Sequence, residues 1–440
     1  MNLGAVLEQL ALSGPSPLAA DASLVRALSP DLAETTVPFG SWAELLGSYS
    51  AFTARPVTAA VLARDEEDQI SACLRSLSAD ADHVLLVDTG STDRTVARAR
   101  EALPAVEVVE SPWRDDFAYH RNLALARGTQ GWTLFIDADE TIAAPDRGDL
   151  RRVLRVLDYL VPEAAFVVSP TIVDADGRTY TDNHRILRGG TPIAFRGRIH
   201  ERPYDHEGTT PPRAYLGVRL DHTGYTPQEM ARKDKVRRNG RLLELCRAAE
   251  PDNPKWLYYL VRDTMDLDAV PADQLRRLYE DLASAVARAR ASGAGDYATE
   301  RLTDTSALLC ELALRFGGAD EVRRQAGSLD AAGRKVEAAY YTGLIDAGRL
   351  LGRLSSLVDE IDAVRTWETQ DNRHLMGRLY ELQATLALAC GRYGDFGPAR
   401  AAAEERGAGR GLEPDLEQLR LLLSATADTT GRSTRPGQTS

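Results

Sequence analysis

Two aspartates separated by one residue follow a short apolar run near the middle of the chain. The run Trp132–Ile136 has the composition of a buried strand, and Asp137 and Asp139 come directly after it. Because side chains alternate along a strand, the two carboxylates point to the same side. Carboxylates in this arrangement, at the end of a strand, can hold a divalent cation or the ribose and diphosphate of a nucleotide.

Other polar segments border apolar runs in the same way, so the aspartate pair does not stand alone. They are Arg64-Asp65-Glu66, Asp88 to Asp93, Asp116 to Asn122 and, further along, Asp221-His222-Thr223. In the second segment Gly90 permits a tight turn, and Thr92 or Asp93 can cap the helix that follows. Polar residues that repeatedly follow apolar runs predict one site built from several strand ends.

The elements that must position these residues alternate between strands and helices. Strands are predicted at 57–63, 84–87, 106–109 and 133–136, and helices at 67–78, 94–103 and 117–127. This order predicts a largely parallel sheet with helices on both faces. Ligands of such sheets bind outside the carboxyl ends of the strands, so Arg64, Asp88 and Asp137 are expected to meet in one cleft.

The motifs together resemble the family 2 glycosyltransferases of the GT-A fold. The similarity begins at Val57 to Glu66, continues through the Asp88 and Asp116 segments, and ends with the Asp-x-Asp (DXD) motif Asp137-Ala138-Asp139. One departure concerns position 65, where many relatives have asparagine and this chain has Asp65. The resemblance covers roughly residues 56–230 and rests on the order and spacing of all the motifs.

The resemblance implies a binding site for a nucleotide sugar. It assigns the nucleoside end to Arg64, Glu66 and Asp88, and the ribose or diphosphate end to Arg121, Asp137 and Ala138. An acceptor such as the Asp88 carboxylate can pair with the imide N–H of uracil. Arg121 has a second interpretation, in which it anchors its helix by pairing with Asp116 or Asp137.

The resemblance also implies a bound Mg²⁺ or Mn²⁺. Asp139 is the first expected ligand, and His222 is the second, because it follows a predicted strand late in the domain. A lone histidine also has a plain structural interpretation. Glu140 is expected to support the site or to start a helix rather than to bind the metal.

Two adjacent residues are candidates for the general base that would activate the acceptor. Glu201 and His200 lie between the aspartate pair and His222, on the acceptor side of the cleft. On an extended segment neighbouring side chains point in opposite directions, so one of the two is expected to face the cleft. We favour Glu201, and His200 remains the rival because its ordinary pKa of about 6.5 suits proton transfer near neutrality.

After about Arg232 the strand pattern stops and helical periodicity takes over. Apolar and aromatic blocks recur about every 40 residues, which is typical of tetratricopeptide-like helical hairpins, with a plain helical bundle as the alternative. The predicted organisation is an N-terminal helical extension at 1–55, the GT-A domain at 56–232, the helical domain at 233–428 and a disordered tail at 429–440. The fold class is therefore α/β followed by all-α.

Composition limits the partners and the compartment. A formal net charge of −12 argues against nucleic acid as a partner, and four separated cysteines suggest reduced thiols. No apolar run reaches the ~18–20 residues that a transmembrane helix needs, and the N-terminus lacks the basic start of a signal peptide. The expected location is the cytoplasm, and the sequence leaves open whether the chain forms homo-oligomers.

These features predict an inverting, metal-dependent glycosyltransferase that uses a nucleotide-diphosphate sugar. UDP-glucose or UDP-N-acetylglucosamine is the expected donor, and a peptide or protein side chain the expected acceptor, since the whole arrangement resembles peptide and bacteriocin glycosyltransferases. A cell-surface glycan or a small molecule is the alternative acceptor, and a non-catalytic repeat scaffold is the alternative class. A sugar-nucleotide-forming nucleotidyltransferase is disfavoured, because its glycine-rich basic loop would stand where this chain has Arg64-Asp65-Glu66-Glu67.

Overall fold

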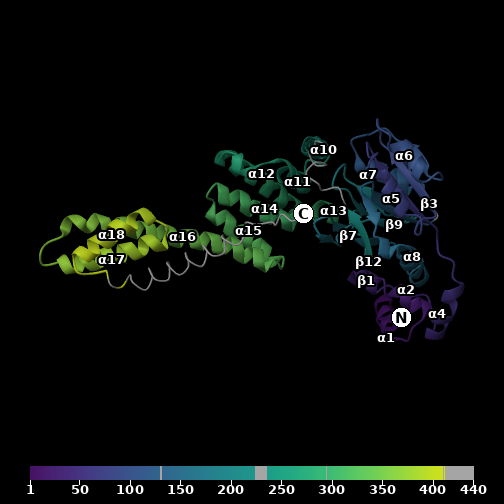
Figure 1. Ribbon diagram of the computed structural model, residues 1–440, viewed down its shortest axis with the longest axis horizontal. Coiled ribbons are helices and arrows are strands. Elements are labelled where there is room, and N and C mark those ends of the chain that lie inside the picture. The colour runs from purple at the N-terminus through teal and green to yellow at the C-terminus, as the bar shows by residue number, and fades with distance from the viewer. Residues whose placement is uncertain (129–130, 223–234, 294, 410, 412–440) are drawn as a thin grey trace, which may run out of the picture. The chain divides into compact units, whose positions relative to one another are not determined.

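The computed structural model of the chain describes residues 1–128, 131–222, 235–293, 295–409 and 411 (Figure 1). The chain forms two compact units, Met1–Phe316 and Gly317–Ser440, which are described separately below. The tail predicted at 429–440 lies outside the described residues. Within the described residues, no helix is long and apolar enough to cross a membrane.

A mixed sheet organises the first unit. Its main path runs β1-β12-β7-β9-β5-β2-β3-β4, with β6 paired to β12 and β8 to β7. Strands β2, β3, β4 and β5 are parallel, as predicted, whereas β9 runs antiparallel to both of its neighbours. The strands are β1 Val25–Leu28, β2 Val57–Ala63, β3 His83–Asp88, β4 Glu107–Glu110, β5 Trp132–Asp137, β6 Glu140–Ile142, β7 Val167–Asp174, β8 Thr179–Tyr180, β9 Ile186–Arg188 and β12 Arg213–His222. A separate two-stranded sheet joins β10 Ala194–Arg196 to β11 Arg202–Tyr204.

Helices cover both faces of the parallel strands, because apolar side chains project from both faces and must be buried. On β5, Leu134 and Ile136 enter the larger core cluster, and Phe135 between them enters the cluster on the opposite face. The larger cluster includes α5 Ile70–Ser76 and α8 Asp149–Leu160, while α7 Phe117–Leu125 packs in the other. A strand buried on both faces explains the continuous apolar run that precedes Asp137.

The N-terminal extension differs from the all-helical prediction in one respect. It contains α1 Leu3–Leu12, α2 Pro17–Ala22, α3 Pro30–Ala33 and α4 Trp42–Ser48, but also β1, which pairs antiparallel with β12. Leu3, Leu18 and Leu45 are buried in the larger core cluster. The extension is therefore part of the sheet and of its core.

Helices follow the sheet in the first unit as well. They are α10 Lys235–Ala249, α11 Pro254–Thr264, α12 Ala272–Ala291, α13 Asp296–Thr299 and α14 Leu302–Arg315, and α6 Thr95–Ala102 lies earlier in the chain. The predicted boundary at 232/233 falls among residues that the structure does not describe, and the two compact units divide at Phe316 and Gly317. These five helices thus belong to the same compact unit as the sheet.

The second unit is a set of helical hairpins. It contains α15 Ala319–Ala331, α16 Lys335–Val364, α17 Arg373–Ala389 and α18 Tyr393–Glu405, and α17 and α18 lie side by side in the yellow part of Figure 1. The turns α15–α16 and α17–α18 both contain a Gly-Arg pair, with Gly333 at φ 81° and Gly391 at φ 79°. In each turn the arginine backbone N–H donates five residues back, to Leu329 and Ala387. The same left-handed glycine thus ends the first helix of each hairpin. The helical region predicted after the strands is confirmed.

Candidate active site

A pocket of about 850 Å³ opens at the carboxyl ends of the parallel strands. Ala63 to Glu66 line it after β2, Thr89 after β3, and Asp137 to Asp139 at the end of β5. His222, the last residue of β12, also lines it. The convergence expected from the strand order is present, because parallel neighbours end at the same edge of the sheet.

Asp139 and His222 face each other across one side of this pocket. The His222 Nε2 atom lies 3.6 Å from Asp139 Oδ2, and its Nδ1 atom lies 2.8 Å from Asp174 Oδ1. Strand pairing explains this arrangement, since His222 sits opposite both Glu140 of β6 and Asp174 of β7. Burial alone would lower the pKa of His222, but its hydrogen bonds to the Asp139 and Asp174 carboxylates raise that pKa to about 9.

This pair fits a divalent cation. A histidine that bonds a carboxylate through one ring nitrogen presents the other to a metal in a fixed direction, and Asp174 has that supporting position. Among the described residues, no group of three or more histidine, cysteine, aspartate and glutamate side chains could hold a metal. A cation at Asp139 and His222 would therefore need further oxygen ligands, such as water or phosphate.

Asp137 is held by two arginines. Its Oδ1 atom lies 3.4 Å from Arg121 Nη2, and its Oδ2 atom accepts from Arg185 Nη2 at 2.9 Å. Burial would raise the pKa of Asp137, but the positive charges of Arg185 and Arg121 hold it below its ordinary value. The carboxylate is therefore ionised, oriented and still part of the pocket lining.

Glu140 holds both Asp137 and Arg185 in position. Its buried carboxylate accepts from the Asp137 backbone N–H at 2.9 Å and from Arg185 Nη2 at 2.6 Å. Burial raises the pKa of Glu140 to about 7, against the opposing effect of Arg185. The supporting role expected for Glu140 agrees with these contacts, whereas Arg185 carries no local sequence signal that would have identified it.

The first two strand-to-helix loops hold each other through polar contacts. Asp65, at φ 56°, accepts from the Thr92 backbone N–H at 2.7 Å, and the backbone N–H of Glu66 donates to Thr95 Oγ1 at 2.7 Å. The helix predicted from residue 67 begins at Ile70. Arg64 and Glu66 line the pocket, as the nucleotide assignment requires.

Asp88, which the resemblance assigns to the nucleoside end, is the last residue of β3. It is buried, and its carboxylate accepts from the backbone N–H groups of Gly90 at 3.4 Å and Ser91 at 3.2 Å. The pocket lining includes Thr89 and not Asp88. These contacts make Asp88 the residue that shapes the turn after β3.

In the third motif, Asp116 and Asn122 make structural contacts, whereas Arg121 lines the pocket. Asp116 caps α7 by accepting from the Tyr119 backbone N–H at 2.9 Å, and Asn122 bonds the backbone of Phe195 in both directions. Arg121 lines the pocket and pairs with Asp137, which is one of its two expected interpretations. Its second partner, Glu201, was not expected.

Both candidate bases line the pocket. Glu201 Oε1 accepts from Arg121 Nε at 2.6 Å, while His200 Nε2 lies 2.5 Å from Asp263 Oδ2 and its ring stacks on Tyr259 at a centroid distance of 4.0 Å. The expectation that only one of them faces the cleft assumed an extended backbone. His200 has a φ of 51°, so the alternation of an extended strand does not apply there.

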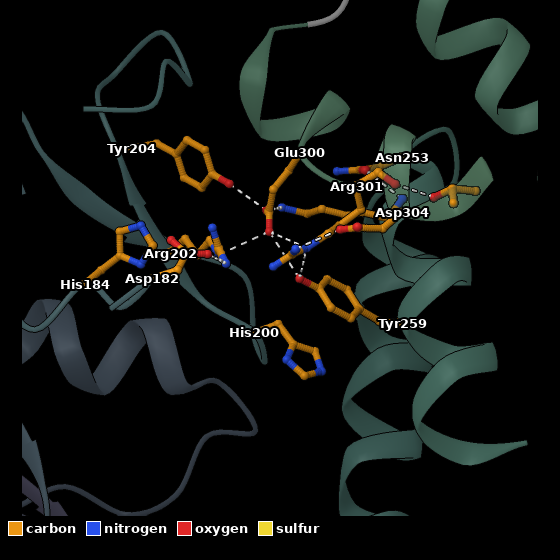
Figure 2. Close-up of polar contacts among 12 residues, drawn as sticks. Asp182, His184, His200, Arg202, Tyr204, Asn253, Tyr259, Glu300, Arg301 and Asp304 are labelled. Carbon is orange, nitrogen blue, oxygen red and sulfur yellow. Dashed lines mark hydrogen bonds and ion pairs between the residues drawn. The ribbon is translucent and has the colours of Figure 1, made fainter. Parts of the chain in front are cut away.

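A buried carboxylate joins the acceptor-side segment to the helices that follow the sheet. Glu300 accepts from Tyr204 Oη at 2.6 Å and Tyr259 Oη at 3.1 Å, and pairs with Arg202 at 3.2 Å and Arg301 at 3.1 Å (Figure 2). Burial would raise the pKa of Glu300, but Lys255 and these arginines lower it. Helices α10 and α11 and the residue before α14 bring four residues into the pocket lining that are not among the predicted site residues: Arg238, Asn239, Tyr259 and Arg301.

Residues 58–216, which carry most of these contacts, match the sequence model of the family described as glycosyl transferase family 2. This segment is a family 2 glycosyltransferase domain. The glycosyltransferase domain contains the whole DXD motif, Arg121, Arg185 and Glu201, whereas His222 and the helical part of the pocket lie beyond the match.

Curated relatives share the glycosyltransferase domain. The SPbeta prophage-derived glycosyltransferase SunS of Bacillus subtilis strain 168 is 32% identical over 235 residues, which are 53% of this chain and 55% of SunS. A TPR repeat-containing protein of Synechococcus elongatus is 30% identical over 205 residues, 45% of this chain and 49% of that protein. The lipopolysaccharide core biosynthesis glycosyltransferase LpsC of Rhizobium meliloti is 32% identical over 166 residues, 36% of this chain and 57% of LpsC.

The chain thus spans about half the length of the curated relatives it matches. The prediction of a family 2 domain with an α/β fold, followed by a helical region, is confirmed.

Proposed function

We propose that this protein transfers a sugar, with inversion, from a nucleotide-diphosphate donor to a peptide or protein side chain. The observation that carries the proposal is the arrangement of Asp139 and His222 beside Asp137, in a strand-end pocket of a family 2 domain. Mg²⁺ or Mn²⁺ held by Asp139 and His222 would neutralise charge on the diphosphate of the donor.

The residues around this pair support a binding mode for the donor. Arg64, Glu66 and Thr89 line the end of the pocket after β2 and β3, where we place the nucleoside, with a UDP-sugar as the proposed donor. We expect Asp137, which Arg121 and Arg185 orient, to accept from a ribose or sugar hydroxyl. A carboxylate that two arginines keep ionised is a good hydrogen-bond acceptor at neutral pH.

Glu201 is the proposed general base. In the proposed step the acceptor oxygen or sulfur forms a bond to the anomeric carbon, and the bond from that carbon to the diphosphate oxygen breaks. The acceptor proton passes to Glu201, and the electron pair of the broken bond leaves with the nucleoside diphosphate. Arg121, which donates to Glu201 and also contacts Asp137, ties the base to the donor side of the pocket.

The acceptor class rests on the helical region. A family 2 domain followed by helical hairpins resembles peptide glycosyltransferases, and helical-repeat surfaces commonly bind extended partners. A cell-surface glycan acceptor is the second candidate, because LpsC is a relative named for lipopolysaccharide core biosynthesis.

The test measures UDP release by the purified chain from UDP-glucose and UDP-N-acetylglucosamine, with Mn²⁺ or with EDTA. We expect metal-dependent release that Asp139→Ala reduces by at least about 10²-fold, because it removes a ligand of the proposed cation. Asp176→Ala, which changes an exposed aspartate on a surface turn, is the matched control. Release that is equal in EDTA, or equal in Asp139→Ala, would refute the metal site.

Mass spectrometry of serine and cysteine peptides, and of lipid-linked glycans, then decides the acceptor. Addition of a hexose or N-acetylhexosamine mass to peptides supports the proposed class. Modification of glycans alone would replace the peptide acceptor by the second candidate.

A further inference from the structure

Arg238 reaches the pocket from a helix that lies beyond the family 2 match. It belongs to α10, is half-buried and lines the pocket together with its neighbour Asn239. In the sequence it is one of several basic residues, Lys233, Lys235, Arg237 and Arg238, which predict either a solvated helix face, the favoured interpretation, or a stretch that flanks the donor's diphosphate. The structure separates them, since Arg237 is exposed and Arg238 is not.

Contacts with the loop before α7 fix the position of Arg238. Arg241, one turn further along α10, forms an ion pair with Asp115, and Asp115 also accepts from Trp113 Nε1 at 2.8 Å. The Arg238 guanidinium lies over the Phe117 ring, 5.3 Å from its centroid. The helix is therefore anchored to the segment that leads into the third motif.

Among the described residues, the charge of Arg238 is not paired with a carboxylate as the charges of the other pocket-lining arginines are. Each of the other pocket-lining arginines, Arg64, Arg121, Arg185, Arg202 and Arg301, lies within 4.0 Å of a carboxylate oxygen. Among the described residues no carboxylate comes this close to Arg238, whose Nε and Nη2 atoms donate to Asn239 Oδ1 at 3.3 and 3.1 Å.

An arginine in this state favours an anionic ligand. Burial lowers the pKa of Arg238, and Glu201 acts in the opposite direction from a distance. A half-buried cation is stabilised by an anion beside it, and a phosphate that enters the pocket would supply such an anion. A guanidinium has five N–H donors, so two bonds to Asn239 leave three for such a ligand.

The neighbours of Arg238 indicate which anion this is. Phe117 and Trp113 belong to the side of the pocket next to Thr89, because the Trp113 backbone N–H donates to the Thr89 oxygen at 3.2 Å. Glu201 lines the same pocket, and its negative charge raises the pKa of Arg238. In the proposed donor complex, the diphosphate lies between the nucleoside end and the base, and every turnover requires that anion to be bound.

We propose that Arg238, oriented by Asn239, binds a phosphate oxygen of the donor's diphosphate, so that a helix outside the family 2 match completes the donor site. This inference rests on the proposed function and adds a specific residue to it. Guanidinium–phosphate hydrogen bonds are charge-assisted and forked, which suits both holding the donor and retaining the product nucleotide.

The test measures binding to the full chain by isothermal titration calorimetry, with uridine, UDP and inorganic pyrophosphate as probes. Arg238→Met is expected to weaken UDP and pyrophosphate by about 10- to 100-fold, the size of one charge-assisted contact, and to leave uridine unchanged. Arg238→Lys keeps the charge without the fork and should lie between wild type and Arg238→Met. Arg237→Met removes an exposed charge from the same turn and should bind like wild type. Titrations are run in Mg²⁺ and repeated in EDTA, so that the contribution of the metal is separated from that of Arg238.

The outcomes separate this inference from the proposed function. If wild type binds UDP and Arg238→Met binds it equally well, the inference is wrong while the donor assignment survives. If Arg238→Met changes only the KM of an acceptor, the anion belongs to the acceptor and the inference is again wrong. If wild type does not bind UDP, the proposed donor fails, and the pyrophosphate titrations alone decide the role of Arg238. Arg238→Lys, with its fold verified by circular dichroism, guards against a loss of binding caused by misfolding of Arg238→Met.

Discussion

At the scale of single residues, the pocket combines ion pairs that orient carboxylates with a few groups that face a ligand. Asp137 and Glu201 share Arg121, and Asp139 shares His222 with Asp174. Pairing of this kind fixes side-chain directions before a ligand binds, which lowers the entropic cost of forming the complex. The two candidate bases have different partners, Arg121 for Glu201 and Asp263 for His200. A substitution of one therefore leaves the contacts of the other in place.

Glu201→Gln is expected to lower kcat by about 10²–10⁴-fold while leaving UDP affinity nearly unchanged. The amide keeps the shape of the side chain but cannot accept the acceptor proton. Steady-state kinetics of transfer to a serine peptide measure the effect, and Glu207→Gln, an exposed glutamate near the same segment, is the control.

His200→Ala tests the rival. If Glu201→Gln is fully active and His200→Ala is not, then His200 is the base and the Asp263 contact orients its ring. A cysteine acceptor, already partly ionised near pH 8, should depend less on either residue.

At the scale of elements, the helices after the sheet are part of the pocket and not an appendage to it. Glu300 binds Tyr204 and Arg202 of β11 and also Tyr259 of α11, so β11 and the helices hold each other. Arg238 and Tyr259 line the pocket directly. The limit of the compact unit at Phe316 therefore predicts where the chain can be shortened.

A chain that ends at Phe316 is expected to fold and to release UDP from the donor at a rate close to that of the full chain. A chain that ends at residue 234 should release little or none, because it lacks Arg238, Tyr259, Arg301 and Glu300 and leaves Tyr204 without its partner. Size-exclusion chromatography and thermal unfolding check the fold, and donor hydrolysis checks the site.

Transfer to a peptide separates the two roles that the helices could have. If the second unit binds the acceptor, the chain ending at Phe316 hydrolyses the donor but modifies peptides poorly. Unchanged peptide modification by that chain would remove acceptor binding from the second unit.

At the scale of the whole molecule, stability depends on pH through histidines with opposite shifts. His184 lies in the pocket lining, where its Nε2 atom is 2.5 Å from Arg213 Nη2. Burial and the nearby positive charges of Arg213 and Arg202 lower the pKa of His184 to about 3. His222 has a raised pKa of about 9, so its contribution changes on the alkaline side.

The free energy of unfolding is expected to fall as the pH decreases below about 6.5, because the unfolded chain then binds a proton at His184 that the folded chain does not. For this one group the loss between pH 7.5 and pH 5 is about 1–2 kcal/mol. Urea unfolding at the two pH values measures it, and His184→Gln should remove this part of the dependence. An identical pH dependence in His184→Gln would contradict the assignment and leave the acid sensitivity to other groups.

The sequence by itself determined the local features of this protein. Apolar runs that end in polar residues identified β2, β3 and β5, and the rule that parallel strands end at one edge brought Arg64, Asp137 and Asp139 into one pocket. His222 could also be placed, because it closes a strand-like run. These inferences succeed because strand direction and side-chain alternation are set by residues close together in the chain.

Only the tertiary structure decided the partners of these residues and the far wall of the pocket. Arg185 reaches Asp137 across 48 residues of sequence, and Tyr204 reaches Glu300 across 96. Asp88 bonds the backbone of its own turn, and β1 was not expected at all. No local pattern distinguishes Arg238, inside the pocket, from Arg237 on the surface. Long-range packing selects among many equivalent arginines, and that selection depends on where distant elements meet rather than on the residues beside them in the chain.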